Sequence, residues 1–466
     1  MSPTLYVILL AFVAGMGGLL FGYETAVISG TTEALQAHFQ ITDLQLGWVA
    51  ASALAGCVAG VLVAGWFADR FGRKAGMIVS GVLFALASIG AAVAPNVDVL
   101  IAARLIGGVG VGIASMVTPL YIAEISPPAV RGGLVSLNQI AIVTGMLFAY
   151  LMNRSIVGWG DQAWMNVSGW RWMFGMMLAP SAIFLLLSLF VPESPRWLAQ
   201  RGFLDRARDL INRIATPDRS KEAFDAIITS LAEAEGTVGE LFRPGARGIT
   251  FMSMVLALFQ AFTGINIVMY YAPRIFLKAG LAASDAYGHS ILIALVMIAA
   301  TAVSLVLVDR VGRRPIILTA SAGMGISLLL MGLVYPRGDE AAAPLSILPA
   351  WVVAHQGMIL LLCTLSYVSW FSMGMGGIYW VVVSEIFPNR IRGRAMALSV
   401  VFLWIGNFLV TQYYPVMLSR LGGDSFFVFA AACLACLVFV AACVPETKGR
   451  SLESIEAEFF GHPGSA

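Results

Sequence analysis

Residues 17–30 read Gly-Gly-Leu-Leu-Phe-Gly-Tyr-Glu-Thr-Ala-Val-Ile-Ser-Gly, and they place one carboxylate, Glu24, late in an apolar segment that begins near Leu5. About 20 consecutive apolar residues are enough for a helix to cross a bilayer. An ionisable side chain inside such a span is costly and needs a partner or a function. The stretch therefore predicts a membrane-spanning helix that carries a functional carboxylate.

The other apolar segments contain one further charge at comparable depth, Arg104, near the start of the span that opens at Val99. Glu24 lies five residues before Ser29, and Arg104 lies five residues after Val99. A rise of about 1.5 Å per residue puts each roughly 8 Å from a helix end. We expect the two side chains to pair if those ends lie on the same face of the membrane. A permanent anchor between two helices is the alternative use of such a pair.

The composition is that of a polytopic membrane protein. Of the 466 residues, 59% are hydrophobic and 12% are charged, whereas roughly a quarter are charged in soluble domains. The 28 basic and 26 acidic residues form no long basic run, so nucleic acid is not expected as a partner. The five cysteines all fall in apolar spans and predict no metal site, and no cofactor is expected. Neither H-E-x-x-H nor G-x-S-x-G occurs, so the chain is not predicted to be an enzyme.

Twelve apolar spans are predicted, six before one long polar segment and six after it. They begin near Leu5, Leu46, Ala75, Val99, Gly133, Trp172, Thr250, His289, Pro315, Gly357, Gly393 and Phe426. The expected architecture is an all-α membrane protein with a six-helix bundle at 1–191, an intracellular helical linker at 192–248, a second six-helix bundle at 249–446 and a short cytoplasmic tail at 447–466.

The basic residues in the connecting loops indicate the orientation. The loops after the even-numbered spans, together with the C-terminus, hold 21 of the 28 Lys and Arg residues, and the opposite loops hold six. Both termini are therefore predicted to be cytoplasmic, and Glu24 and Arg104 both lie toward the outer side. Short loops and a compact tail favour a bacterial cytoplasmic membrane.

The two halves of the chain repeat each other. Three charged motifs recur: Asp69-Arg-Phe-Gly-Arg-Lys74 as Asp309-Arg-Val-Gly-Arg-Arg314, Glu124 to Arg131 as Glu385 to Arg392, and Val191-Pro-Glu193 as Val444-Pro-Glu446. A duplicated six-helix unit is the layout of a carrier that rocks its halves about a site near the membrane midplane.

These motifs make the chain similar to the sugar porter family of the major facilitator superfamily, along essentially its whole length. It is most like the bacterial proton-coupled pentose and hexose symporters and the facilitative glucose carriers. The motif Gly65-x-x-x-Asp69-Arg70-x-Gly72-Arg73-Lys74 marks the superfamily. The sugar branch is marked by Arg104 at the head of a glycine-rich helix, by Pro192-Glu-Ser-Pro-Arg196 and by Pro445-Glu-Thr-Lys-Gly449. The glycine-rich face follows no strand, so close helix packing is its expected use rather than phosphate binding.

The resemblance supports an inner gate held shut by the cytoplasmic charged motifs while the carrier faces outward. The network would contain Asp69, Arg73, Glu124, Arg131, Glu193, Asp309, Arg313, Glu385, Arg392 and Glu446. Solvated charges that only set the topology are the alternative interpretation.

A sugar presents hydroxyl groups and one apolar ring face, so its site needs amide side chains beside aromatic ones. Such residues at suitable positions in the spans are Phe21, Gln139, Gln260, Asn266, Trp380, Trp404 and Asn407. The resemblance implies sugar contacts for Gln139, Gln260, Asn266, Trp380 and Trp404, and an outer gate at Tyr270 and Tyr271. Helix-to-helix hydrogen bonds and simple packing are the alternative uses of these side chains.

Three positions depart from the family pattern. Ala261 stands where the family commonly has a second glutamine, Met297 where relatives have an asparagine, and Gly376-Gly377 where relatives have Gly-Pro. Each lost amide removes a hydroxyl partner worth about 1 kcal/mol. The substrate or its pose should therefore differ from that of the glucose and xylose carriers, and a polyol such as an inositol stays open.

The resemblance also implies a role for Glu24, since this position holds Asp in the proton-coupled relatives and Asn in the facilitative carriers. Protonation of Glu24 would release Arg104 and permit closure over the sugar. The prediction is proton-coupled import of a monosaccharide or related polyol by a monomeric carrier in a lipid bilayer. A facilitative sugar uniporter and a non-transporting sugar sensor are the alternatives. The short stretch after the last motif argues against a sensor, which would be expected to carry a long signalling tail.

Overall fold

The structure is a computed structural model, and it describes residues 2–215, 217–232, 237–336 and 349–448. Within these ranges the regular structure is helical, with no strand. Residues 449–466 of the predicted tail, Gly449 of its motif among them, lie outside the described part. The side chain of Asp309 also lies outside it.

Eleven stretches of the described residues are long and apolar enough to cross a membrane. The last of them, Arg390–Cys443, is 54 residues long and contains two helices, α20 (Asn389–Leu421) and α21 (Ser425–Cys443). The two separate at Gly422, whose φ of 54° lies in the left-handed region that favours glycine. The twelve predicted spans and the all-α fold class are therefore confirmed.

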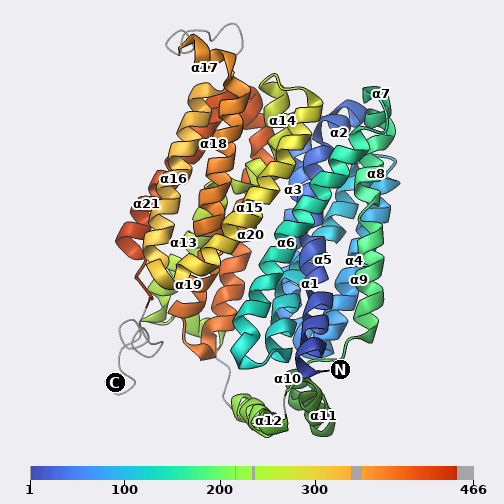
Figure 1. The fold of residues 1–466 in the computed structure, drawn as a ribbon, viewed down its shortest axis with the longest axis vertical. Coiled ribbons are helices and arrows are strands. Elements are labelled where there is room, and N and C mark those ends of the chain that lie inside the picture. The colour runs from blue at the N-terminus through green and yellow to red at the C-terminus, as the bar shows by residue number, and fades with distance from the viewer. Residues whose placement is uncertain (1, 216, 233–236, 337–348, 449–466) are drawn as a thin grey trace. The chain divides into compact units, whose positions relative to one another are not determined.

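The first half of the chain supplies six spans: five begin within five residues of the predicted start, and the sixth begins at Gln162, ten residues before Trp172. They are α1 (Pro3–Val27) with η1 (Ile28–Gly30), α3 (Asp43–Phe71), α4 (Arg73–Ala92), α5 (Val97–Ile125), α6 (Pro128–Val157), and a sixth span built from α7 (Gln162–Trp164), η2 (Met165–Gly169), α8 (Trp170–Gly175) and α9 (Leu178–Phe190). A short helix, α2 (Thr32–Phe39), connects the first two spans (Figure 1).

The second half supplies the other six, two of which are interrupted. They are α13 (Ala246–Phe262) with α14 (Ile265–Lys278), α15 (Ala283–Val311), α16 (Arg313–Val334), α18 (Gln356–Phe371) with the π-turn η6 (Ser372–Gly376) and α19 (Ile378–Ile386), and finally α20 and α21. The remaining short elements are α17 (Ala350–Ala354) and η7 (Gly422–Asp424). The break between α13 and α14 falls at Gly264, whose φ is 95°.

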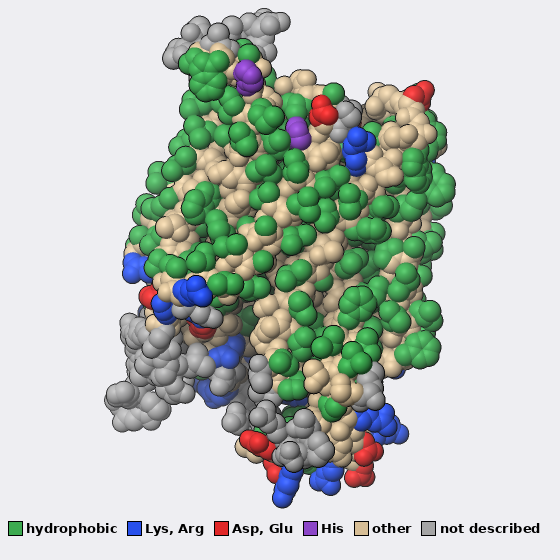
Figure 2. All heavy atoms as spheres, viewed as in Figure 1, with side chains coloured by type: hydrophobic (Ala, Val, Ile, Leu, Met, Phe, Trp, Pro, Cys, Tyr) green, Lys and Arg blue, Asp and Glu red, His purple; other side chains and the backbone are tan. Residues whose placement is uncertain are grey.

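The long polar segment folds into α10 (Pro195–Gln200), α11 (Leu204–Ile214), α12 (Pro217–Ala232) and η3 (Val238–Phe242). Ala199, Ala207, Ile211 and Phe224 form a small core between α10, α11 and α12, which lie together in Figure 1. Lys, Arg, Asp and Glu side chains gather over α11 and α12 (Figure 2). The helices are thus amphipathic, with a buried apolar stripe and a charged outer face.

The chain divides into two compact units. The first unit is Met1–Val27, Ser52–Met152 and Val167–Glu235, and the second is Ile28–Ala51, Asn153–Asn166 and Gly236–Ala466. Residues 28–51 and 153–166 of the first half therefore pack with the second half.

Helices α3 and α5 of the first unit approach each other at their backbones because glycines line the contact. A Cβ atom on Gly56 would lie 2.2 Å from the carbonyl oxygen of Leu105, and one on Gly108 would lie 1.9 Å from that of Ala53. Close helix packing, the expected use of the glycine-rich fourth span, is what the structure shows.

We predict that Gly56→Ala destabilises the protein by about 1–3 kcal/mol, since the added methyl group overpacks a backbone contact. Gly65→Ala, on the same helix, is the matched control because a Cβ there meets nothing within 4 Å. Thermal unfolding in detergent measures both. Equal unfolding temperatures for the two variants would contradict the packing described above.

Candidate transport site

The first unit contains a buried ion pair between α1 and α5. Arg104 Nη1 lies 3.3 Å from Glu24 Oε1, within hydrogen-bonding reach. The two residues are only 1% and 3% exposed. The structure thus brings together the two charges that the sequence places at equal depth.

The neighbours of the pair are small or apolar. A Cβ on Gly107 would lie 3.1 Å from the Glu24 carboxyl, so the absence of a side chain at this position makes room for the carboxylate. The Arg104 guanidinium lies 5.6 Å from the ring centre of Phe174. The neighbouring Tyr23 donates a hydrogen bond to the carbonyl of Met173. Because so little water surrounds the pair, adding one proton to Glu24 would greatly weaken its electrostatic attraction to Arg104.

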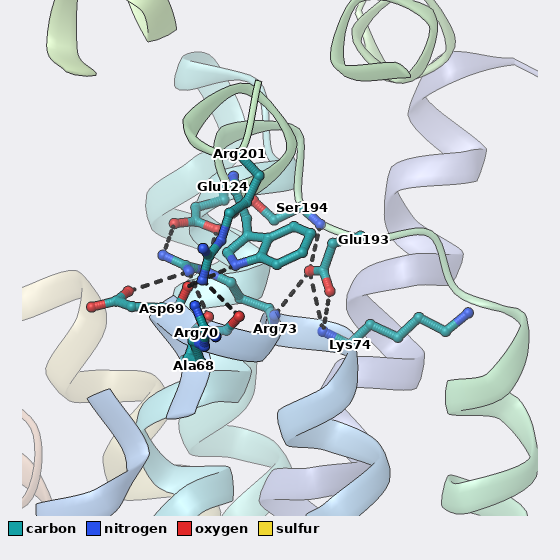
Figure 3. A network of polar contacts seen from close by, with 10 residues as sticks. Ala68, Asp69, Arg70, Arg73, Lys74, Glu124, Glu193, Ser194 and Arg201 are labelled. Atoms are coloured by element: carbon teal, nitrogen blue, oxygen red, sulfur yellow. Dashed lines mark hydrogen bonds and ion pairs between the residues drawn. The ribbon is translucent and has the colours of Figure 1, made fainter. Parts of the chain in front are cut away.

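A second charged cluster of the first unit surrounds Arg73, the first residue of α4 (Figure 3). Arg73 makes a bidentate contact with Glu124, with Nε to Oε2 and Nη2 to Oε1 both 2.9 Å. Its Nη1 donates to the carbonyl of Ala68 and lies 3.4 Å from Asp69 Oδ1. Ser194 Oγ donates to the same Glu124 carboxylate. This arrangement ties the ends of α3, α4 and α5 to the start of α10.

Glu193 caps the N-terminus of α4 in this cluster. Its Oε1 accepts from the backbone N–H of Arg73 at 2.8 Å, and both of its oxygens accept from that of Lys74 at 3.2 Å. The carboxylate fits because Gly72, with φ of 98°, has no Cβ; one would lie 2.1 Å from Glu193 Oε2. An anion at a helix N-terminus satisfies free N–H groups and opposes the positive end of the helix dipole.

The second unit repeats this arrangement with its own residues. Arg313, the first residue of α16, contacts Glu385 with Nε to Oε2 at 3.2 Å and Nη2 to Oε1 at 2.9 Å. Glu446 accepts from the backbone N–H of Arg313 at 3.0 Å and of Arg314 at 3.1 Å. Thr447 Oγ1 donates to Glu385 at 2.6 Å. The repeated sequence motifs therefore fold into repeated clusters.

Two arginines of the proposed network contact backbone carbonyls in the described part of the chain. Arg131 Nη2 lies 3.5 Å from the carbonyl oxygen of Ser126, and Arg392 Nε lies 3.4 Å from that of Phe387. Each arginine thus holds the loop that precedes its own helix.

The first unit contains Phe21 on α1 and Gln139 on α6, both half-buried. The two helices are in backbone contact here, because a Cβ on Gly22 would lie 1.8 Å from the carbonyl oxygen of Ile142. Asn138, beside Gln139, is buried, and its Oδ1 accepts no hydrogen bond from the described residues. Asn138 is not among the residues predicted from the sequence to bind the sugar, although it is an amide directly beside Gln139.

Two buried amides of the second unit are oriented by hydrogen bonds. Gln260 Nε2 on α13 donates to the carbonyl of Met375 at 3.0 Å, which lies in the π-turn η6. Its Oε1 is buried and accepts nothing from the described residues. Asn266 Nδ2 on α14 lies 3.4 Å from Thr411 Oγ1 on α20. A π-turn leaves carbonyl groups free of the regular helical pattern, and here one of them fixes the Gln260 amide.

The aromatic residues predicted to face the sugar also lie in the second unit. Trp404 and Asn407 on α20 are 7% exposed, and Asn407 Oδ1 accepts no hydrogen bond from the described residues. Trp380 on α19 is half-buried and packs edge-on against Tyr379, with ring centres 5.1 Å apart. Among the residues predicted to bind the sugar, Gln260 and Asn407 thus offer unpaired amide oxygens, and Trp380 and Trp404 offer indole rings, the groups that a sugar would use.

Tyr270 and Tyr271, predicted to form an outer gate, are buried on α14. Tyr271 donates to the carbonyl of Thr411 at 2.9 Å, and its ring centre lies 5.3 Å from that of Tyr414. Three residues further along the helix lies Arg274, which is 3% exposed. The charge count from the sequence places Arg274 among the six basic residues of the opposite loops, whereas in the structure α14 continues to Lys278.

The described residues contain no group of three or more His, Cys, Asp or Glu that could hold a metal ion. The two halves of six spans, the buried ion pair and the duplicated charged clusters define a secondary carrier of the major facilitator type.

Known proteins agree with this class. The family described as "Sugar (and other) transporter" matches residues 10–459. The chain is 36% identical to the arabinose-proton symporter of Bacillus subtilis (strain 168), over 97% of this chain and 94% of that protein. It is 36% identical to the D-xylose-proton symporter of Escherichia coli (strain K12), over 97% and 95%. The inward open structure of the xylose transporter XylE from E. coli matches with a TM-score of 0.84 and 34% identity, over 97% of this chain and 100% of that one.

The chain belongs to the sugar (and other) transporter family. It is a multi-pass membrane protein that transports sugar, and not an enzyme. The resemblance expected from the sequence motifs is confirmed.

The two capping glutamates, Glu193 and Glu446, differ in their acidity. Burial raises the pKa of the Glu193 carboxyl above its ordinary value, in spite of its N–H donors. Burial also opposes ionisation of Glu446, but backbone N–H groups, led by those of Lys448 and Arg313, outweigh it and hold its pKa below the ordinary value.

We predict opposite pH effects on stability from these two groups. The ordinary pKa of glutamate is about 4.3. Glu446 stabilises the folded state fully above about pH 4.3, and this stabilisation is lost as the pH falls through its lowered pKa. Glu193 stabilises the folded state fully below about pH 4.3, and this stabilisation is lost as the pH rises through its raised pKa. Unfolding temperatures measured between about pH 3.5 and 7 should therefore fall less steeply toward acid in Glu446→Gln. In Glu193→Gln, the unfolding temperature should fall less steeply toward neutral pH than in the unaltered protein. Identical profiles for the two variants would contradict the assignment.

Proposed function

We propose that this carrier imports a monosaccharide or a related polyol together with a proton, and that Glu24 is the proton-binding group. The observation that carries the proposal is the buried Glu24–Arg104 pair. Two relatives that are 36% identical over nearly the whole chain are named as proton symporters of arabinose and D-xylose. Their names support coupling in this chain but do not identify its sugar.

The coupling follows from electrostatics. With Glu24 ionised, the pair is neutral overall and holds α1 against α5. A proton on Glu24 removes the charge–charge attraction, and this loss is costly because both side chains are buried. Switching a population from 1:99 to 99:1 requires about 5.5 kcal/mol of differential stabilisation. A buried ion pair that is made in one state and broken in the other is sufficient for such a switch.

We further propose that the sugar hydroxyls bind the amides of Gln139, Gln260, Asn266 and Asn407. Phe21, Trp380 and Trp404 would contact the apolar face of the ring, and Tyr270 and Tyr271 would close over it. Two unpaired, buried amide oxygens, Gln260 Oε1 and Asn407 Oδ1, support this role. Each such oxygen accepts a hydrogen bond from a hydroxyl, so the substrate should donate at both positions.

The inner clusters are proposed to serve as the inner gate. The residues are Asp69, Arg73, Glu124, Arg131 and Glu193 in the first half and Asp309, Arg313, Glu385, Arg392 and Glu446 in the second. Bidentate Arg73–Glu124 and Arg313–Glu385 contacts make each cluster rigid. We also propose a bacterial cytoplasmic membrane, cytoplasmic termini, a functional monomer and no nucleic-acid partner.

Glu24→Gln should abolish gradient-driven sugar accumulation, because glutamine cannot carry the proton, while exchange of sugar across the membrane continues. The measurement is uptake of labelled pentoses, hexoses and inositols into proteoliposomes with and without an inward proton gradient. Glu222→Gln, an exposed change on α12, is the matched control and should accumulate sugar normally. Equal uptake with and without the gradient in the unaltered protein would instead make this a facilitative uniporter.

Gln260→Ala should raise the KM for the transported sugar about tenfold, since it removes an acceptor for one hydroxyl at a cost of about 1.4 kcal/mol. A set of deoxy and deoxyfluoro analogues then tests the amide orientation. At the hydroxyl that faces Gln260 Oε1, the fluoro analogue should bind as poorly as the deoxy analogue, because fluorine cannot donate. Full affinity for every fluoro analogue would contradict this orientation.

A further inference from the structure

Arg274 is a buried cation of the second unit, and no function assigned above uses it. Arg274 Nη2 lies 2.9 Å from Asp43 Oδ1, and its Nε lies 3.4 Å from Glu33 Oε1. Its Nη1 donates to Gln36 Oε1 at 2.9 Å. One guanidinium from α14 thus contacts the acidic side chains of α2 and of the first residue of α3.

The partners of Arg274 are themselves linked. Gln36 Nε2 donates to Asp43 Oδ1 at 3.1 Å, which joins α2 to α3. The side chain of Arg274 is 3% exposed, whereas those of Asp43 and Glu33 are 24% and 40% exposed. The arginine therefore lies on the protein side of the cluster and the carboxylates on its water side. Separation of the elements would hydrate all three charges.

Close backbone contacts accompany this charge cluster. Tyr287 on α15 donates to the carbonyl of Gly30 at 3.1 Å, and Gln412 Nε2 on α20 donates to that of Leu44 at 2.9 Å. A Cβ on Gly47 would lie 1.9 Å from the carbonyl oxygen of Gln412. Ion pairs, hydrogen bonds and a close glycine contact thus hold residues 28–51 against helices α14, α15 and α20.

We propose that Arg274, Asp43, Glu33 and Gln36 form an outer latch, which holds the outer ends of the first two spans on α14 and must open before sugar enters from outside. This rests on the proposed orientation and on alternating access. Arg274 follows Tyr270 and Tyr271 by about one helical turn. Closing the latch therefore also positions the two tyrosines. The arginine is a positioning residue and does not touch the sugar.

The latch is tested by the accessibility of a buried residue beneath it, in the absence of sugar and of a proton gradient. Thr31 is fully buried between η1 and α2, so Thr31→Cys provides the reporter. The purified protein in detergent is treated with a water-soluble maleimide, and mass spectrometry measures labelling at residue 31 separately from the five native cysteines.

Arg274→Gln should raise the labelling rate about tenfold, because Asp43 and Glu33 then lose the guanidinium that both of them contact. Gly47→Ala should raise it as well, by steric clash with α20. The charge exchange Arg274→Asp with Asp43→Arg should restore slow labelling. Arg171→Gln is the matched control: Arg171 donates to the carbonyl of Ala92 and stacks over Trp170, so its loss should leave the rate unchanged.

An unchanged rate in Arg274→Gln, or labelling in the charge-exchanged protein as fast as in the single variant, would overturn the latch. If Arg274→Gln does not fold, the labelling rates at residue 31 in the charge-exchanged protein and in Gly47→Ala test the latch instead. Fast labelling in the charge-exchanged protein, or an unchanged rate in Gly47→Ala, would then overturn it. The experiment involves neither sugar nor protons, so it can fail while the transport proposal stands, and the transport proposal can fail while the latch stands.

Discussion

The ion pair between Glu24 and Arg104 is the constraint on which the account depends. A carboxylate and a guanidinium almost without solvent contact are stable only while they face each other. This requirement explains the glycine at 107, where a Cβ would crowd the carboxylate. The glycine-lined contact of α3 with α5 packs the helix that carries Arg104. A single proton on Glu24 neutralises the carboxylate and so removes its attraction to Arg104. This makes the pair suited to coupling sugar transport to proton binding.

The charged clusters at the helix ends follow a different logic, since rigidity rather than switching is what their geometry provides. Each combines a bidentate arginine–glutamate contact with a glutamate that caps a helix N-terminus across a glycine of positive φ, Gly72 in one half and Gly312 in the other. The same local structure arises twice because the same motif occurs twice. The two copies differ in both burial and donors: Glu193 is the more buried and its pKa is raised, whereas Glu446 is less buried, has one more backbone N–H donor and has a lowered pKa.

Much of this architecture was predictable from the sequence because hydropathy dominates in membranes. Twelve spans, the internal repeat and the Glu24–Arg104 pair each follow from apolar length, motif spacing and the rarity of buried charge. Arg274 was missed because it lies one turn from a helix end, next to Pro273, where the sequence of a loop and of a helix terminus look alike. The orientation of Gln260 was also beyond the sequence, because it depends on the carbonyl of Met375 in a π-turn, more than 100 residues away. Contacts of this kind are set by tertiary packing, which composition and spacing do not encode.

The most direct test of the central claim is whether sugar movement itself carries protons. Proteoliposomes containing a pH-sensitive dye in the lumen, with no gradient imposed, are given the transported sugar from outside, and lumenal pH is recorded. The account predicts acidification of the lumen by the unaltered protein and none by Glu24→Gln. Sugar entry without any change in lumenal pH in the unaltered protein would contradict it.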